Sequence, residues 1–337
     1  MDNDVVYIDA ACNINYASFY IRGLREIYGV HNVRFTGKYF KQLKYDTDTH
    51  ILAFVINNRK YVIDFADAND IYYDLFLEWT DVYGKVNYNT SRLPQNYSKK
   101  VVRVGANFGV ACYGTNRYMS VVWCIWHYLK CYKRLNYPFK SFLSPYLWAY
   151  KHKQINTIPI QDYSKTIFFV SRFWKGQNDT NNYRINFIRA CKRLEKEGLV
   201  NFIGGMVVDS CDNNCPDDVL LKNEIPYCEY IDNLNRSILV FNTPAYHKCH
   251  GWKLPEYLSY GKAIISTQFV NELPIPLEHE RNIYFTEGDE CSIYENLKKI
   301  ICDEQLLNTL RKGSAAYWKQ YACFSECVKL FITSNCK

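Results

Sequence analysis

The clearest structural signal in this chain is the run His250-Gly251-Trp252-Lys253-Leu254-Pro255-Glu256-Tyr257-Leu258-Ser259-Tyr260-Gly261-Lys262-Ala263-Ile264-Ile265-Ser266. One glycine precedes a short helical segment, a second glycine ends it, and an apolar strand follows at once. A helix that passes directly into a buried strand is typical of the strand–helix units of a parallel sheet. The start of such a helix also suits an anionic ligand, because its free N–H groups and dipole attract phosphate.

The same alternation continues on both sides of this run. The expected strands are Thr166–Val170, Val200–Ile203 (ending at Gly204-Gly205), Tyr227–Ile231, Ser237–Phe241 and Lys262–Ile265. The expected helices are Asn181–Glu197, Glu290–Ile301 and Asp303–Tyr321. Repeated units of this kind predict a doubly wound α/β sheet. Ligands of such sheets bind where the strands end at their carboxyl sides. The loops after these strands are therefore the places to look for a site.

The first half opens with a similar unit, a strand at Val5–Ile8 and a helix at Tyr16–Tyr28 that ends at Gly29. His50–Ile56 and Tyr61–Phe65 alternate around a polar turn and predict a strand pair. With 337 residues, two domains are expected. We place the junction near Ile155–Lys165. The expected domains are 1–158 and 159–317, with a terminal helix at 318–335 that packs back on the first.

Charge is unevenly distributed along the chain. The net charge is +7, and no acidic residue lies between Asp81 and Asp162, a window with twelve Lys and Arg residues. Such a window predicts an anionic partner, whether a membrane surface or a lipid-linked pyrophosphate, while an incidental surface bias remains the alternative. Contact with an anionic membrane is expected through residues 85–153, and nucleic acid is a less favoured partner.

Met119–Leu129 is the most apolar helical segment of that window, but it is too short to span a bilayer. It is either a buried core helix or an interfacial helix with a basic end. Because the whole segment is apolar rather than one face of it, we favour a core helix.

The fourteen cysteines are mostly scattered singly, and the N-terminus lacks the pattern of a signal peptide. These features predict a cytoplasmic protein, with a possible peripheral position on the inner face of the cell membrane. The spacing of Cys and His does not suggest a zinc site, and neither a metal nor a resident cofactor is expected.

Two segments contain residues of the types that bind phosphate and ribose. After the strand that ends at Val170, Ser171 is followed by Arg172 and Lys175, and such a pair of cations can neutralise a diphosphate. Glu256, about one turn into the helix of the opening run, can accept two hydrogen bonds from a ribose diol. The alternative for each is an ordinary solvated side chain.

These two segments resemble the donor-site motifs of GT-B glycosyltransferases, especially family 4 and related bacterial polysaccharide enzymes. The resemblance consists of a helix with Glu256 followed by Gly261-Lys-Ala-Ile-Ile-Ser266, and of the Arg172…Lys175-Gly176 loop. It covers residues 165–320 and implies two Rossmann-like domains facing a central cleft. By position, it implies that Arg172 and Lys175 contact the diphosphate and Glu256 the ribose. The other donor-binding positions that we assign are Ser171, Gly204, Tyr230, Asp232, Asn242, His250, Gly251, Trp252, Lys253 and Leu254.

Two positions depart from the family pattern. The first glutamate of the motif corresponds to Lys248, and the Arg172–Lys175 spacing is three residues rather than about five. A retaining or an inverting outcome therefore stays open. A retaining enzyme would rely on Arg172 and Lys175 to stabilise the leaving phosphate. An inverting enzyme would need a base on the first domain, for which Asp9 at the end of the first strand is chosen from Asp9, Asp64, Asp67 and His127.

The resemblance predicts transfer of a sugar from a nucleotide-sugar co-substrate to a glycan or a lipid-linked acceptor in surface polysaccharide synthesis. The acceptor would contact the first domain, at Asn13, Tyr16, Asn107 and Phe108. Two other functions remain: a nucleotide-sugar epimerase on the same fold, and a non-catalytic protein that binds an anion or a membrane.

Overall fold

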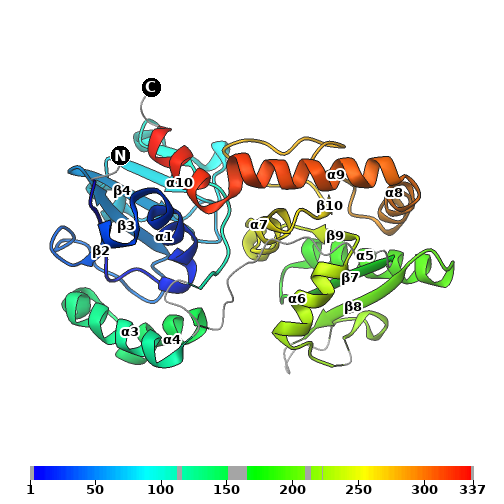
Figure 1. Cartoon of the computed structure of the whole chain (residues 1–337), viewed down its shortest axis with the longest axis horizontal. Helices are drawn as coiled ribbons and strands as arrows, with labels where there is room; N and C mark the ends of the chain where they lie inside the picture. Colours follow the sequence, from blue (N-terminus) through cyan, green and yellow to red (C-terminus); the bar gives the residue numbers. More distant parts are fainter. Residues whose placement is uncertain (1–3, 112–115, 151–164, 209–213, 222, 335–337) are drawn as a thin grey trace. The chain divides into compact units, whose positions relative to one another are not determined.

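The computed structural model describes residues 4–111, 116–150, 165–208, 214–221 and 223–334 (Figure 1). The chain forms two compact units. Unit 1 holds Met1–Asn156, Asn271–Ile275 and Gln320–Lys337, and unit 2 holds Thr157–Val270 and Pro276–Lys319. The junction expected near 155–165 lies almost wholly outside the described residues. Each unit is an α/β structure, which confirms the predicted fold class.

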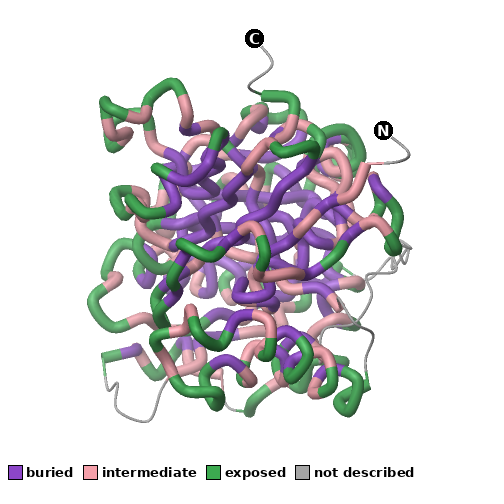
Figure 2. Tube along the Cα trace, turned by 90° about the vertical axis from the view of Figure 1, so that its left-hand side faces the viewer, coloured by how far each residue is buried: buried purple, intermediate pink, exposed green. Residues whose placement is uncertain are grey.

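Unit 1 is built on a six-stranded mixed sheet in the order β2-β1-β3-β4-β5-β6. Its strands are β1 (Val6–Asp9), β2 (Val33–Thr36), β3 (Ile51–Ile56), β4 (Arg59–Asp64), β5 (Val82–Lys85) and β6 (Val101–Arg103). All neighbours are parallel except β3, which runs antiparallel to both β1 and β4. β3 and β4 form the predicted strand pair, whose turn holds Asn57 and Asn58 at positive φ. β3 lies between β1 and β4 inside the sheet, and all six of its residues are buried. Figure 2 shows that buried residues gather in the interior of the trace and exposed residues at its surface.

Helices from distant parts of the sequence cover this sheet. The first, α1 (Ile14–Tyr28), begins after Asn13, whose side chain accepts a hydrogen bond from the backbone N–H of Asn15. It lies beside α10 (Phe324–Thr333), the last helix of the chain (Figure 1). Phe331 of α10 packs edge-on against Phe54 and Tyr61 of the sheet. The end of the chain is thus part of the unit 1 core.

Three further helices belong to unit 1: α2 (Asp74–Trp79), α3 (Arg117–Cys131) and α4 (Phe139–Ala149). α4 is a single helix although it contains Pro145. The preference for a core helix at Met119–Leu129 is wrong. α3 buries one face and leaves large apolar side chains exposed on the other. None of the described helices has the length and hydropathy needed to cross a bilayer.

Unit 2 has parallel strands throughout its described part. They are β7 (Thr166–Arg172), β8 (Asn201–Val207), β9 (Leu239–Asn242), β10 (Ala263–Ser266) and β11 (Tyr284–Phe285). β8 pairs with β7, and β9, β10 and β11 pair in that order. The backbone N–H of Ile238 donates to the carbonyl of Thr166 at 2.8 Å, which brings β9 beside β7. The carboxyl ends of β7 and β9 therefore lie together.

The helices of unit 2 are α5 (Asn178–Lys196), α6 (Tyr227–Arg236), α7 (Lys253–Ser259), α8 (Glu290–Cys302) and α9 (Glu304–Tyr317). Phe187 of α5 stacks on Phe241 of β9 with ring centroids 4.2 Å apart, and Phe169 of β7 meets both rings edge-on. These three aromatic side chains are almost fully buried. They pack the middle of α5 against β7 and β9, and the candidate site lies at the carboxyl ends of these two strands.

Two expectations for unit 2 are wrong. Tyr227–Ile231 is the beginning of α6 and not a strand. Its apolar residues Tyr227, Tyr230, Ile231 and Leu234 recur at spacings of three and four, and Pro226 precedes them as the N-cap. β8 also does not end at Ile203 but continues through Gly204 and Gly205 to Val207.

Candidate functional site

The loop after β7 presents Arg172 at the carboxyl edge of the unit 2 sheet. Arg172 is exposed, and its guanidinium carbon lies 5.8 Å from the centroid of the Trp174 ring. Asn181 on α5 fixes this loop, because its side chain accepts from the Trp174 N–H at 3.0 Å and donates to the Trp174 carbonyl at 2.7 Å. Lys175 is exposed in the same loop, and Gly176 follows at a φ of 75°. Ser171 is buried in the strand.

Arg184 is a buried cation at this edge that the sequence analysis did not select. Only 5% of it is exposed. Its Nη1 donates to the carbonyl of Arg172 at 2.6 Å, and its Nε donates to Thr243 Oγ1 at 3.4 Å. Burial lowers the pKa of Arg184 to about 10. An arginine on the otherwise apolar side of the α5 pattern, one turn from Ile188, was the signal that could have revealed it.

Lys253, the first residue of α7, lies close to this arginine. Its Nζ donates to the Val170 carbonyl and lies 4.5 Å from the centroid of the Phe169 ring. Burial, together with the charge of Arg184, lowers the pKa of Lys253 to about 7, while Glu256 acts in the opposite direction. Lys253 and Arg184 are thus two neighbouring cations, and the charge of Arg184 disfavours the charged form of Lys253.

Glu256 lies one turn further along α7. Its Oε2 accepts a hydrogen bond from Tyr230 Oη at 2.9 Å, and the Tyr230 ring packs edge-on against Phe168 of β7. Burial raises the pKa of Glu256 to about 7, although the Tyr230 hydrogen bond and Lys253 favour its charged form. The structure thus brings together Glu256, Tyr230 and Lys253. It leaves Asp232 exposed on α6.

The segment between β9 and α7 forms the next part of the edge. Asn242 ends β9 and donates to Ser266 Oγ at 3.0 Å. His250 is buried and packs edge-on against Phe269 at 5.4 Å. His247 and Lys248 both have positive φ, at 51° and 61°, an uncommon backbone for residues other than glycine. A small pocket in this segment is lined by Asn242, Thr243, Pro244, Lys248, Cys249, His250, Phe269 and Val270.

The opening run itself divides into exposed and buried positions. Gly251 and Trp252 are half-buried, and they lead directly into Lys253. Leu254 is only 1% exposed and belongs to the core. Lys248, which stands where the family motif has a glutamate, lies 3.8 Å from a carboxylate oxygen of Asp179. A cation therefore occupies that position in this chain.

The donor role assigned to Gly204 conflicts with its position. Gly204 is in the middle of β8, beside β7, and a Cβ atom there would lie 1.9 Å from the Phe169 carbonyl oxygen. Its backbone has a φ of 156°. Close approach of the two strands explains this glycine without a ligand.

Asp9 is enclosed in unit 1 and does not suit the role of a base. It is 0% exposed, and its carboxylate pairs with Arg134. The same carboxylate accepts from Tyr45 Oη at 2.9 Å and from the Ala11 N–H at 3.0 Å. Burial raises the pKa of Asp9, although the ion pair acts against this. With its oxygens held by three internal donors, Asp9 connects β1 to the rest of unit 1.

Two other candidate bases are also internal. Asp64 accepts from Lys85 Nζ at 2.8 Å and from Tyr83 Oη at 2.6 Å, and none of the three is exposed. His127 Nδ1 lies 2.6 Å from Tyr146 Oη, and burial lowers its pKa to about 3. Asp67 is half-buried in the loop after β4.

The residues assigned to the acceptor side gather at the carboxyl edge of unit 1. The Asn107 side chain donates to the Tyr16 carbonyl at 2.7 Å. The Tyr16 ring stacks on Phe65 at 5.7 Å and lies 5.6 Å from the ring of His50. Asn13 caps α1, and Phe108 is buried against Phe19. His50, which the sequence analysis did not select, is half-buried here and its Nδ1 has no hydrogen-bond partner.

Among the described residues, no group of three or more His, Cys, Asp and Glu side chains is arranged to hold a metal ion. Within the described residues, an Asp-x-Asp sequence occurs at Asp46 and Asp48. The Asp46 carboxylate accepts from Thr49 Oγ1 at 2.7 Å and from the Asp48 N–H at 3.1 Å. Asp46 thus stabilises its own turn.

No protein-family model and no curated protein matches the chain significantly. Solved structures that it resembles include a UDP-forming α,α-trehalose-phosphate synthase from Burkholderia vietnamiensis (TM-score 0.43, 11% identity, 78% of this chain and 61% of that chain). A UDP-GlcNAc 2-epimerase from Neisseria meningitidis bound to UDP-GlcNAc gives a TM-score of 0.39 and 12% identity, over 77% of this chain and 62% of that chain.

The C-terminal domain of a group 1 glycosyl transferase from Francisella tularensis gives a TM-score of 0.36 and 13% identity, over 49% of this chain and 88% of that domain. Glycosyltransferases, the class that the sequence resembles, are therefore among the structural neighbours. This chain spans about three fifths of the length of the synthase and the epimerase.

Proposed function

We propose that the protein is a glycosyltransferase that uses a nucleotide-sugar donor bound at the carboxyl edge of the unit 2 sheet. The observation that carries the proposal is the pair of cations Arg184 and Lys253. Arg184 is 5% exposed, and its hydrogen-bond partners among the described residues are a carbonyl and a hydroxyl rather than a carboxylate. A buried cation without a counterion is costly, and a bound diphosphate would supply the missing negative charge.

The other roles follow from position around this pair. Arg172 and Lys175 lie in the exposed loop after β7, where they would reach the outer oxygens of the diphosphate. Glu256 would accept hydrogen bonds from the ribose hydroxyls, and Tyr230 holds its carboxylate in place. As the sugar–phosphate bond breaks, these cations would stabilise the negative charge on the leaving diphosphate. In this scheme no metal ion is needed.

The acceptor is proposed to be a glycan or a lipid-linked glycan in surface polysaccharide synthesis, bound by unit 1. Tyr16 and Asn107 would contact it, because they lie together at the carboxyl edge of that sheet. For an inverting reaction, we replace Asp9 by His50 as the candidate base. His50 is half-buried between two aromatic rings, whereas Asp9 is enclosed. We also propose a cytoplasmic protein that contacts an anionic membrane through residues 85–153.

Binding of nucleotide sugars to the purified protein tests this function. We expect one of the UDP-, GDP- or dTDP-sugars to raise the melting temperature, and Glu256→Gln to weaken its affinity roughly tenfold or more, as for loss of a hydrogen bond to a charged group. The amide oxygen of the substituted side chain would still accept from Tyr230, so the fold should persist. Glu229→Gln on the exposed side of α6 is the matched control and should leave the affinity unchanged.

Absence of stabilisation by every nucleotide and nucleotide sugar would count against the proposal. Incubation of the bound nucleotide sugar without an acceptor then separates transfer from epimerisation. Release of free sugar by slow hydrolysis agrees with a transferase, whereas conversion to an epimeric nucleotide sugar would show the second function on this fold.

A further inference from the structure

Helix α3 exposes a continuous apolar face. This α3 face consists of Tyr118, Met119, Val122, Ile125, Trp126 and Leu129, which are between 45% and 83% exposed. Their spacing of one, three and four residues places them on one side of the helix. The side that packs into unit 1 holds smaller or polar residues, Ser120, Cys124, His127 and Cys131. Surface helices of soluble proteins usually show the reverse arrangement.

Exposed cations surround the α3 face. Arg117 begins α3, Lys133 follows its end, and Lys140 lies in the first turn of α4; all three are exposed. Lys130 is half-buried: its Nζ lies 4.6 Å from the centroid of the Trp126 ring and donates to the Phe35 carbonyl at 2.9 Å. Neither helix contains an acidic residue, and the sequence has none between Asp81 and Asp162. α3 and α4 therefore contribute positive charge and no carboxylate to this surface.

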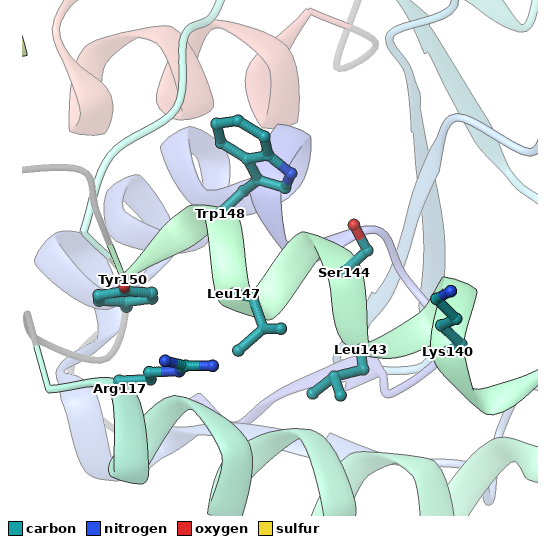
Figure 3. Close-up of a pocket in the computed structure, with 7 residues that line it drawn as sticks. All are labelled: Arg117, Lys140, Leu143, Ser144, Leu147, Trp148 and Tyr150. Atoms are coloured by element: carbon teal, nitrogen blue, oxygen red, sulfur yellow. The ribbon is translucent and has the colours of Figure 1, made fainter.

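A groove of about 510 Å³ lies between α3 and α4, and it is lined by both apolar and positively charged side chains. Leu143, Leu147 and Trp148 supply most of its apolar lining, while Arg117 and Lys140 contribute the two cations. Figure 3 shows Arg117 of α3 together with Leu143 and Leu147 of α4 facing the space between the helices. An apolar groove with cations at its rim suits an amphiphilic anion.

We propose that the α3 face docks on an anionic lipid bilayer, with its apolar side chains among the acyl chains and the surrounding cations on lipid phosphates. Aromatic residues such as Trp126 and Tyr118 favour the headgroup level, and basic residues beside them strengthen binding to anionic lipid. A second copy would place like charges against each other, and a nucleic acid would not use the apolar side chains. The inference deepens the proposed membrane contact but does not depend on glycosyl transfer.

Flotation of the full-length protein with lipid vesicles tests the proposal. We expect binding to vesicles that contain phosphatidylcholine and phosphatidylglycerol, and much weaker binding to phosphatidylcholine alone. High salt should weaken binding only in part, because salt screens the charges but not the apolar contacts.

Two double variants separate the apolar and the charged contributions. Trp126→Ser with Leu129→Ser should lower the partition coefficient roughly tenfold or more, since two exposed apolar anchors are lost. Val30→Ser with Leu75→Ser is the control, because these side chains are 62% and 41% exposed elsewhere in unit 1. Lys133→Gln with Lys140→Gln should also lower it roughly tenfold. Lys41→Gln with Lys44→Gln, also exposed in unit 1, should have little effect.

Each variant needs an unchanged circular dichroism spectrum and melting temperature, which shows that a loss of flotation is not a loss of folding. The proposal is overturned if the protein does not float with anionic vesicles, or if the Trp126 and Leu129 variant floats like the unaltered protein. It is also overturned if light scattering shows a dimer that this variant dissociates, or if single-stranded nucleic acid binds and the apolar substitutions have no effect. Nucleotide-sugar binding is measured separately, so failure of either proposal is recognised by itself.

Discussion

Lys253 and Glu256 lie one turn apart on α7, and each has a pKa moved toward neutrality by burial. Arg184 beside Lys253 adds a second cation, whereas Glu256 is the nearby carboxylate. The cluster therefore has an excess of positive charge when Lys253 is protonated. Binding of a diphosphate would offset this excess, and it would also raise the pKa of Lys253.

The raised pKa of Glu256 predicts a pH-dependent stability. Its folded pKa is about 7 against an ordinary value of 4.5, so between these values the folded state binds a proton that the unfolded chain has lost. The contribution of Glu256 to stability should therefore fall as the pH rises through this window. Glu256→Gln removes the dependence, and the melting temperature of the variant should rise relative to the unaltered protein between pH 4.5 and pH 7.

Lys253 affects stability in a different pH range. Its pKa is lowered from 10.5 to about 7, so its contribution to stability changes between these pH values. The two contributions can thus be separated by thermal unfolding at several pH values. A constant difference in melting temperature between Glu256→Gln and the unaltered protein across the acidic window would contradict the assignment.

At the scale of elements, the pairing of β7 with β8 determines how the Arg172 loop leaves the sheet. Gly204 allows the two strands to approach, since a Cβ atom would lie 1.9 Å from the Phe169 carbonyl oxygen. Phe169 in turn packs against Phe187 and Phe241, which position α5 and its Arg184. A substitution in the middle of β8 should therefore displace Phe169 and, through its packing on α5, change the position of Arg184.

Gly204→Ala should lower the free energy of unfolding by roughly 3 kcal/mol or more, because backbone and not a flexible side chain blocks the added methyl group. Gly198→Ala is the matched control. Gly198 also has positive φ, at 72°, but nothing lies within 4 Å of the added Cβ, so a loss of about 1 kcal/mol is expected. Equal losses in urea unfolding of the two variants would show that β7 and β8 can separate at little cost.

At the scale of the molecule, the chain returns to its first unit after building the second. α10 supplies Phe324 and Phe331 to the unit 1 core, and a Cβ atom at Gly23 of α1 would touch the Phe324 backbone. The helix that ends the described chain is thus required for the unit that begins it. We therefore expect unit 1 to complete its folding only after α10 has been synthesised.

Phe331→Ala should destabilise unit 1 selectively. Removal of a buried phenylalanine side chain costs roughly 3–5 kcal/mol, and Phe331 is 1% exposed. Hydrogen exchange should accelerate in β3, β4 and α1, while β7, β9 and β10 keep their protection. Lys329→Ala, on the exposed side of α10, is the control and should leave exchange unchanged. Uniform acceleration in both units would contradict the division.

Local patterns in the sequence determined the positions of many strands and helices. Strand–helix alternation predicted β7, β9, β10 and α5 within a few residues, because buried strands and amphipathic helices have different periods of apolar residues. The prediction of a strand at Tyr227–Ile231 was wrong, because a short apolar run does not distinguish a strand from a helix. Glu256 and Arg172 could be selected from neighbouring glycines and strand ends. Whether they bind a nucleotide sugar stays a prediction.

Only the tertiary structure decided which charged residues are internal. Asp9 lies at the end of β1, a position that suits a catalytic base. Its carboxylate, however, forms an ion pair with Arg134, which is more than a hundred residues away in the sequence. Arg184 lies on the apolar side of the α5 pattern, and only its contacts with residues of β7 and of the segment after β9 show that its charge is internal. The apolar α3 segment likewise suggested a core helix, and packing buried only one side of it. Burial and ion pairing depend on contacts between distant residues, which local periodicity does not encode.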